Sequence, residues 1–173
     1  YDSKTEGKLL LMNSATTLQQ LLHGSLSERA TAAEHLAQQG SEAAYAACEL
    51  TAACGDAGAI SDWAVAALEQ LGPPPLSALE SLVSLTHSED PLTVYWAVTL
   101  LGRAGPEAAV HEQVLVTLLQ HSKDLAVQEK AAWSLGRMQA NSLGATQALQ
   151  QASQSPEARL SRVAAKSLQQ TKT

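Results

Sequence analysis

Few side chains in this 173-residue chain have the types and spacings that catalysis or metal binding needs. Cys48 and Cys54 stand six residues apart, and on one helix that spacing separates them by roughly 9 Å along the axis, too far for a disulfide. No histidine lies within a few residues of either, so the pattern favours small apolar side chains in a packed helix over a nucleophile. The sequence contains neither a glycine-rich phosphate loop nor a Cys-x-x-Cys pair.

Three histidines occupy comparable places along the chain. His87 and His121 hold the same place in successive segments, with His23 close to it. Ligands of one metal ion must lie about 2 Å from it, and side chains one repeat apart cannot do so. We expect each imidazole near a helix C-terminus, where it faces the negative end of the helix dipole; a pH-sensitive contact with a partner is the alternative. We predict no metal and no cofactor.

The net charge limits the classes of partner. Lys and Arg total 11 against 17 Asp and Glu, a formal net charge of −6, which argues against general nucleic-acid binding. No apolar run, residues 9–12 included, is long enough to cross a bilayer, and no signal-peptide pattern is present. We therefore expect a cytoplasmic protein with no membrane or nucleic-acid partner. Residues 1–13 are expected to be a flexible leader, 14–170 one repeat domain and 171–173 a tail.

Helices must position these side chains, because Ala and Leu dominate the composition while Ile occurs once and Phe not at all. Five segments align on one Ala column and, four residues later, one Leu column; the Leu residues recur every 32 to 34 positions. Such a period indicates a repeat architecture, whereas a plain antiparallel bundle needs no repeat in register. The aligned segments are residues 25–40, 57–72, 90–105, 124–139 and 157–170.

Each period is predicted to hold two helices, A and B. The A helices follow Asp or Ser, which are good N-caps, and the first three end at Gly40, Gly72 and Gly105, expected C-terminal caps. An additional B-type helix, from about Ser14 to Leu22, opens the chain, so the expected order is B, four A–B pairs and a final A. The other B helices are expected to start near Glu42, Pro75, Glu107 and Ser142.

The third segment carries a family resemblance. Asp90-Pro91, Val94, Ala97-Val98, Leu100-Leu101-Gly102 and Gly105 resemble the short HEAT-like repeat found in phycobilisome lyase subunits, and residues 124–136 are similar to it as well. Across residues 14–170 the resemblance implies an all-α fold, a right-handed α-α superhelix (solenoid) of about five HEAT-like helix pairs. It also implies A helices on the convex face and B helices on the concave face.

The sequence departs from this pattern where Arg usually follows the Val. Val94 is followed by Tyr95 and Val127 by Gln128, and only Arg29 occupies the Arg column. In HEAT arrays this Arg often pairs with the Asp of a neighbouring repeat. The resemblance therefore implies weak ion-pair ladders between the repeats of this chain.

Enzymes built from HEAT repeats provide a further comparison. The deoxyhypusine hydroxylase family places His-Glu pairs directly before the Ala column and binds two irons. The lone His111-Glu112 pair lies on a B helix instead, so we predict no di-iron site and no catalytic residue. The positions before the Ala column read Ala30-Thr31, Asp62-Trp63, Tyr95-Trp96, Glu129-Lys130 and Arg162-Val163.

Charge is divided between the two helix types. From residue 42 to 153 the B helices carry five glutamates and no Lys or Arg, so the concave face is predicted to be acidic and polar. Such a face suits a basic or polar segment of a protein partner; a solvated face that keeps the domain soluble is the alternative. The candidate partner-binding residues on the B helices are Glu49, Glu80, His111 and Glu112.

The tryptophans are candidates for packing or for partner binding. Trp63 and Trp96 share a column beside the Ala column, and we expect them to pack between repeats. Trp133 lies about 200° around its helix from the Ala column. On the convex side it is a candidate partner anchor, with packing under a neighbouring side chain as the alternative.

These features predict a non-enzymatic HEAT-like scaffold that mediates protein–protein interaction. One alternative is a bilin lyase-like protein or enzyme subunit, although the B helices offer a tetrapyrrole no basic side chain. The other is a fragment of a longer structural solenoid, because the final A helix has no B helix after it and the uncapped ends would permit self-association.

Overall fold

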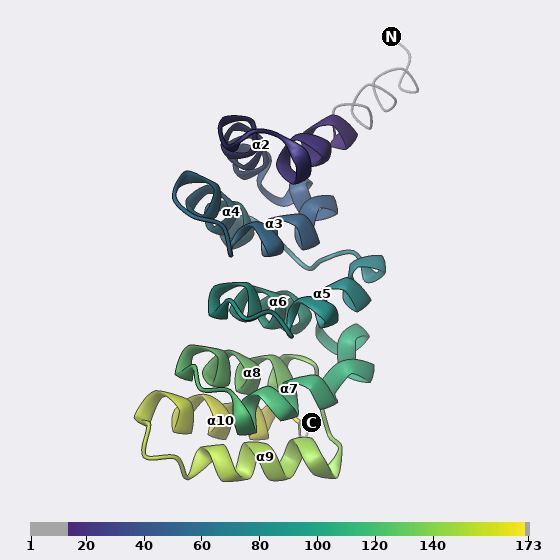
Figure 1. Ribbon diagram of the computed structural model, residues 1–173. Coiled ribbons are helices and arrows are strands. Elements are labelled where there is room, and N and C mark those ends of the chain that lie inside the picture. The colour runs from purple at the N-terminus through teal and green to yellow at the C-terminus, as the bar shows by residue number, and fades with distance from the viewer. Residues whose placement is uncertain (1–13, 172–173) are drawn as a thin grey trace. The chain divides into compact units, whose positions relative to one another are not determined.

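The computed structural model describes residues 14–171, and within that range its regular structure is entirely helical (Figure 1). The expected leader, residues 1–13, and residues 172–173 of the expected tail lie outside the described residues. The described chain divides into two compact units, with the boundary between Leu71 and Gly72. Each unit is a stack of helix pairs in the predicted order, which confirms the all-α repeat fold.

The first unit begins with the predicted extra B-type helix, which covers residues 14–23. After it, A helix α2 packs on A helix α4, and B helix α3 also packs on α4. The remaining elements of this unit are α2 (Leu26–Gln39), η1 (Gly40–Ala46), α3 (Ala47–Ala53) and α4 (Ala59–Gln70).

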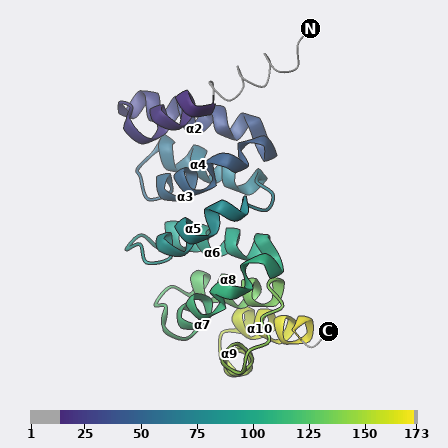
Figure 2. The same ribbon diagram turned by 90° about the vertical axis from the view of Figure 1, so that its right-hand side faces the viewer.

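The second unit holds three A helices in series. Helix α6 packs on α8 and α8 on α10, while B helix α7 packs on both α8 and α9 (Figure 2). Its elements are η2 (Leu76–Ala78), α5 (Leu79–Leu85), α6 (Pro91–Ala104), η3 (Gly105–His111), α7 (Glu112–His121), α8 (Leu125–Arg137), α9 (Leu143–Ser153) and α10 (Ala158–Gln170).

The two sequence columns form the core of each unit. All five Ala of the column are at most 2 % exposed, and the first four Leu are completely buried. Only Leu168, in the last A helix, is half-buried. A methyl group at the Ala position lets neighbouring A helices approach closely, and the Leu side chains fill the space between layers.

Most A helices begin at a side-chain N-cap that the sequence predicts. Asp90 accepts a hydrogen bond from the backbone N–H of Thr93 (2.7 Å), and Asp124 accepts one from Val127 (3.1 Å). Ser25 and Glu28 form a reciprocal capping box at the start of α2. These caps satisfy backbone donors that have no partner within the helix.

The helix C-termini match the prediction at two glycines and differ at the third. Gly40 and Gly105 have φ values of 57° and 67°, a region that glycine enters without strain. The expected cap at Gly72 is wrong: α4 ends at Gln70, and Leu71 leaves it with an extended backbone. The equivalent place after α8 is held by Gln139, which has a φ of 54°.

Three B segments begin with tighter turns than the sequence suggests. η1, η2 and η3 are 3₁₀ turns that lead directly into α3, α5 and α7. Among the B segments that follow residue 24, only α9 begins as an α-helix, and there Ser142 accepts a hydrogen bond from the Ala145 N–H at 3.1 Å. The predicted starting positions are thus close to the observed ones, but the geometry of the first turns is not.

Consecutive A helices of the second unit approach closely at two glycine–serine pairs, one at each junction. A Cβ placed on Gly102 of α6 would lie 2.8 Å from Cβ of Ser134 in α8, and a Cβ on Gly136 of α8 would lie 2.7 Å from Cβ of Ser167 in α10. Ser134 also donates to the Val98 carbonyl at 2.8 Å. Larger side chains at either glycine would force these helices apart.

Candidate functional site

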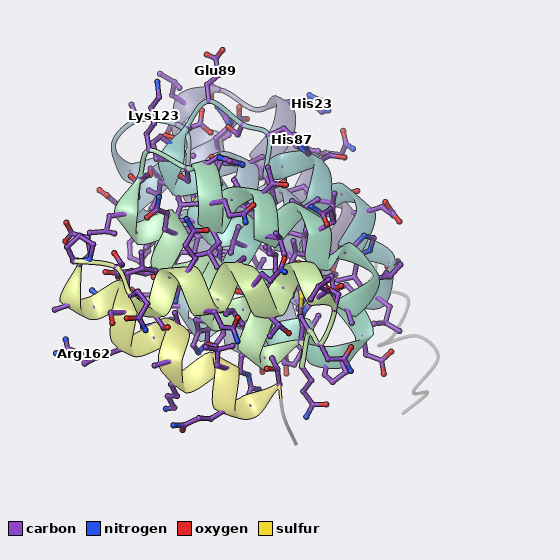
Figure 3. All side chains as sticks on the ribbon, turned by 90° about the horizontal axis from the view of Figure 1, so that it is seen from below. His23, His87, Glu89, Lys123 and Arg162 are labelled. Atoms are coloured by element: carbon purple, nitrogen blue, oxygen red, sulfur yellow. The ribbon has the colours of Figure 1, made fainter. Side chains whose placement is uncertain are left out.

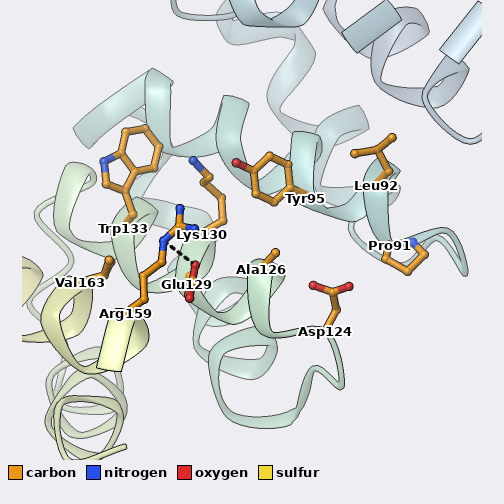
Figure 4. A pocket seen from close by; sticks show the side chains of 10 residues that line it. All are labelled: Pro91, Leu92, Tyr95, Asp124, Ala126, Glu129, Lys130, Trp133, Arg159 and Val163. Atoms are coloured by element: carbon orange, nitrogen blue, oxygen red, sulfur yellow. Dashed lines mark ion pairs between the residues drawn. The ribbon is translucent and has the colours of Figure 1, made fainter. Parts of the chain in front are cut away.

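The second unit contains a groove of about 520 Å³ on the side of its A helices, between α6, α8 and α10 (Figure 4). We call it the A-helix groove. Pro91 and Leu92 border it at the start of α6, with Ala126 of α8 beside them. Its other principal lining side chains are Tyr95 of α6, Glu129, Lys130 and Trp133 of α8, and Arg159 and Val163 of α10.

Lys130 is held between two aromatic rings in this groove. Its Nζ lies 4.9 Å from the centre of the Tyr95 ring and 4.8 Å from the centre of the Trp133 ring. Trp133 is three residues further along α8, on the same side of the helix, whereas Tyr95 comes from the preceding A helix. Both distances are within the range in which an ammonium group is attracted to a ring face.

Trp133 is both packed and accessible. A Cβ on Gly102 would lie 2.7 Å from Cζ3 of its indole, so the ring rests against α6 where that helix has no side chain. The residue is nevertheless only half-buried and lines the groove. Trp133 is thus packed against α6 and accessible in the groove, and its role as a partner anchor stays a prediction.

The two carboxylates of the groove already have partners. Glu129, whose side chain is 11 % exposed, pairs with Arg159 Nε at 3.0 Å, while the Arg159 side chain is 75 % exposed. Asp124 accepts the N-cap hydrogen bond at the start of α8. The Glu129–Arg159 ion pair thus links α8 to α10 at the groove wall, while the Asp124 contact lies at the start of α8 itself.

The aromatic contacts continue from the groove into the core. The Tyr95 and Trp96 rings meet edge to face, with centres 5.6 Å apart, and Arg103 lies 5.6 Å from the centre of the Trp96 ring. Trp96 is 6 % exposed, as the packing prediction requires, and its indole Nε1 is buried with no hydrogen-bond partner among the described residues. Trp63, for which packing was also predicted, is instead 37 % exposed.

The predicted B-helix residues do not form one described site. Glu80 of α5 and His111 at the end of η3 lie together, with Oε1 and Nε2 3.8 Å apart; the Glu80 side chain is 86 % exposed and that of His111 14 %. Glu112 begins α7 and is half-buried. Glu49 belongs to α3 of the first unit.

Large apolar side chains are exposed where the B segments of the second unit begin. Leu76, Val110 and Leu143 are 61 %, 82 % and 74 % exposed. They are separated by about one repeat, and Figure 1 shows η2, η3 and the beginning of α9 on one side of this unit. Helical periodicity places Leu76 and Val110 on the apolar stripes of their B helices, and that expectation is wrong, because both lie in the 3₁₀ turns that precede α5 and α7.

The remaining candidates for chemistry are histidines and cysteines. His87, labelled in Figure 3, follows the end of α5, and His121 ends α7, as predicted. Cys48 and Cys54 form no disulfide. Within residues 14–171 no cluster of three or more His, Cys, Asp or Glu side chains is arranged to hold a metal ion. None of the helices there has the length and apolar character required to cross a membrane.

Sequence reasoning missed three groove residues, Tyr95, Lys130 and Arg159. The available signal was the Lys130–Trp133 spacing, since residues three apart on a helix are neighbours. Tyr95 is harder to find, because in the aligned repeats it corresponds to Glu129 and not to Lys130.

Stacked A and B helices around Ala and Leu columns, with a groove on the A-helix side, define an α-helical repeat protein. The sequence profile of HEAT repeats matches residues 79–169, more than half of the chain. The protein therefore belongs to the HEAT repeat family.

Solved structures show the same fold. A crystal structure of an engineered protein superposes with a TM-score of 0.65 at 21 % sequence identity, covering 92 % of this chain and 79 % of that one. A second engineered protein gives 0.63 at 20 % identity; it covers 92 % of this chain, which spans 48 % of its length. No curated protein matches the sequence.

Proposed function

We propose that this protein is a non-enzymatic scaffold that binds another protein through the A-helix groove of its second unit. The observation that carries the proposal is the groove itself: Tyr95 and Trp133 line it, and cross-helix contacts hold its charged side chains in place. Trp, Tyr and Arg are the residues that most often dominate the binding energy of protein interfaces. A site built on three packed helices is also pre-organised, which lowers the entropy lost on binding.

Site-specific photo-crosslinking tests this proposal. A photoreactive amino acid placed at Leu92, which borders the groove and is 38 % exposed, should capture a protein partner in cells. The same crosslink should disappear when Trp133→Ala is added, while the circular dichroism spectrum stays helical. A crosslink that survives Trp133→Ala would place the partner outside the groove and contradict the proposal.

The acidic B-helix surface is a second candidate interface. In the second unit, residues 72–88, 105–122 and 140–155 contain three glutamates and no Lys or Arg, and Leu76, Val110 and Leu143 are exposed there. This arrangement supports the prediction of a basic or polar partner segment. A photoreactive residue at Val110 reports on this surface, so the Leu92 and Val110 positions distinguish the two candidate faces.

Charge reversal tests the B-helix surface separately. Replacing Glu80 and Glu112 by Lys should slow association with a basic partner, and binding should weaken as salt rises past about 0.15 M, where the screening length is about 8 Å. Unchanged affinity and salt dependence would exclude this surface. The bilin lyase-type alternative predicts a visible absorbance shift on mixing the protein with a bilin, and the scaffold proposal predicts none.

A further inference from the structure

The charged side chains of the A-helix groove differ in whether they have an ion-pair or hydrogen-bond partner. Its carboxylates, Glu129 and Asp124, are engaged by Arg159 and by a backbone N–H. Lys130 has no such partner: among the described residues, no carboxylate lies within ion-pair distance of its Nζ. Its ammonium lies over the two rings, and rings do not take up its three N–H donors as oxygen acceptors would.

The rings fix where that ammonium is presented. Tyr95 comes from α6 and Trp133 from α8, so the Lys130 side chain has a ring on each side. Its ammonium group is therefore less free to move than that of an ordinary surface lysine. Ordering the side chain before a ligand arrives removes an entropy cost from binding. A pre-positioned ammonium with open donors is suited to a carboxylate, with which it forms a charge-assisted hydrogen bond.

A second cation lies across the groove. Arg159 uses its Nε on Glu129 and remains 75 % exposed. Helix α10 also carries the exposed Arg162 and has no acidic residue between Ala158 and Gln170, although Glu157 directly precedes it. Figure 3 shows Arg162 projecting away from α10. This side of the second unit therefore attracts anionic partners although the whole chain has a net charge of −6.

The rest of the groove is apolar. Leu92, Ala126 and Val163 line it beside the Trp133 indole. Its volume of about 520 Å³ is in the range of pockets that take a small ligand or a few side chains. An apolar side chain of a partner would therefore fill the groove, while the carboxylate of the neighbouring acidic residue reaches Lys130.

We propose that the A-helix groove binds an acidic segment of a protein, in which an Asp or Glu carboxylate accepts a hydrogen bond from Lys130 and an adjacent apolar side chain packs on Trp133. This rests on the proposed function and names the chemistry of the partner. It differs from the basic partner expected at the B-helix surface, because Lys130, Arg159 and Arg162 lie on the A helices.

Two matched peptide libraries test the proposal on the whole chain. In one library a central Glu-Leu pair is fixed, in the other a central Gln-Leu pair, and the remaining positions are randomised. Selection on the immobilised protein should enrich binders from the Glu library. Affinities of the enriched peptides are then measured by fluorescence anisotropy against the variants below.

Lys130→Gln should lower the affinity for the enriched peptides by about tenfold or more, which is the effect of losing a hydrogen bond to a charged group. Lys130→Arg keeps the charge and should retain most of the affinity. Lys166→Gln is the control with the same charge change, on an exposed position outside the groove lining, and should leave affinity within about twofold, as expected for a screened surface charge. Circular dichroism verifies that each variant is folded.

The outcomes separate this inference from the function on which it rests. If peptides bind and require Trp133, but the Gln library yields binders as good as the Glu library, the groove binds protein and the acidic specificity is wrong. If Lys130→Gln binds as tightly as Lys166→Gln, the role of Lys130 is wrong. Displacement of the peptide by an equal concentration of inorganic phosphate or of a single-stranded oligonucleotide would also overturn the inference. If no peptide binds in the groove, the proposed function there fails as well.

Discussion

Arg29 forms a bidentate ion pair with Asp56. Nη1 lies 2.9 Å from Oδ1 and Nη2 lies 2.5 Å from Oδ2, while Nε donates to the Leu21 carbonyl at 2.8 Å. Arg29 belongs to α2, and Asp56 precedes α4 in the next repeat, so one side chain links three consecutive segments of the first unit. This is the Arg–Asp link that the Arg column implies, formed at the position where the sequence retains the arginine.

Removing that ion pair should destabilise the first unit measurably. Both side chains are about one-quarter exposed, so we expect a coupling energy of about 1 kcal/mol between them, above that of fully exposed pairs because the contact is bidentate. A double-mutant cycle with Arg29→Ala and Asp56→Ala, followed by urea unfolding, measures it. A coupling energy indistinguishable from zero would mean that solvent screening cancels the contact.

Truncating the Leu column should be far more costly. Leu101→Ala and Leu135→Ala each remove a completely buried side chain and should lower the free energy of unfolding by about 2–5 kcal/mol. Leu143→Ala is the matched control: its side chain is 74 % exposed, and the expected change is below about 0.5 kcal/mol. Similar losses for all three variants would contradict the assignment of the core.

Gln139→Gly should stabilise the protein. Gln139 has a φ of 54°, a conformation that costs a residue with a Cβ about 1–2 kcal/mol. Glycine relieves that strain but gains freedom in the unfolded chain, so the expected net stabilisation is at most about 1 kcal/mol. Thermal unfolding measures the change. Asn141→Gly, two residues away without a positive φ, should be neutral or destabilising, and equal effects at both positions would refute the strain argument.

The capping box of α2 should make stability depend on pH. The Ser25 backbone N–H and then its hydroxyl donate to Glu28 and hold the pKa of the Glu28 carboxyl below its ordinary value of 4.5. Because the folded-state pKa is the lower one, the stabilisation is fully present above the unfolded-state pKa and is lost as pH falls through the folded-state value. The stability difference between the wild type and Glu28→Gln, measured by urea unfolding, should therefore shrink on acidification. A difference that is constant from neutral to acid pH would show that the carboxylate charge plays no part.

The helix order was predictable because the Ala and Leu columns record which face each A helix buries. The five predicted A segments agree with α2, α4, α6, α8 and α10 to within a few residues. Gly72 shows the limit of local rules: it occupies the glycine column, but the chain leaves α4 at Leu71 and enters the run Pro73-Pro74-Pro75 in an extended conformation. Proline disfavours a helical backbone at the residue before it.

The groove was predictable only in part. Trp133 stood out by its angle on the helix, but its partners depend on the stagger between neighbouring A helices, which no single-helix pattern contains. That stagger brings Tyr95 to Lys130, one residue beyond the position that the repeat alignment pairs with it. Likewise, Glu129 and Arg159 are thirty residues apart, and only the packing of α8 on α10 shows that they meet.

The glycine–serine pairs have a consequence for the length of the array. Helix α8 carries both halves of the pair, with Ser134 facing Gly102 of α6 and Gly136 facing Ser167 of α10. The α8–α9 pair is thus compatible with a copy of itself, since Gly136 of one copy would accept Ser134 of the next. At this glycine–serine contact, an inserted copy of the α8–α9 segment would therefore repeat an arrangement that the chain already contains.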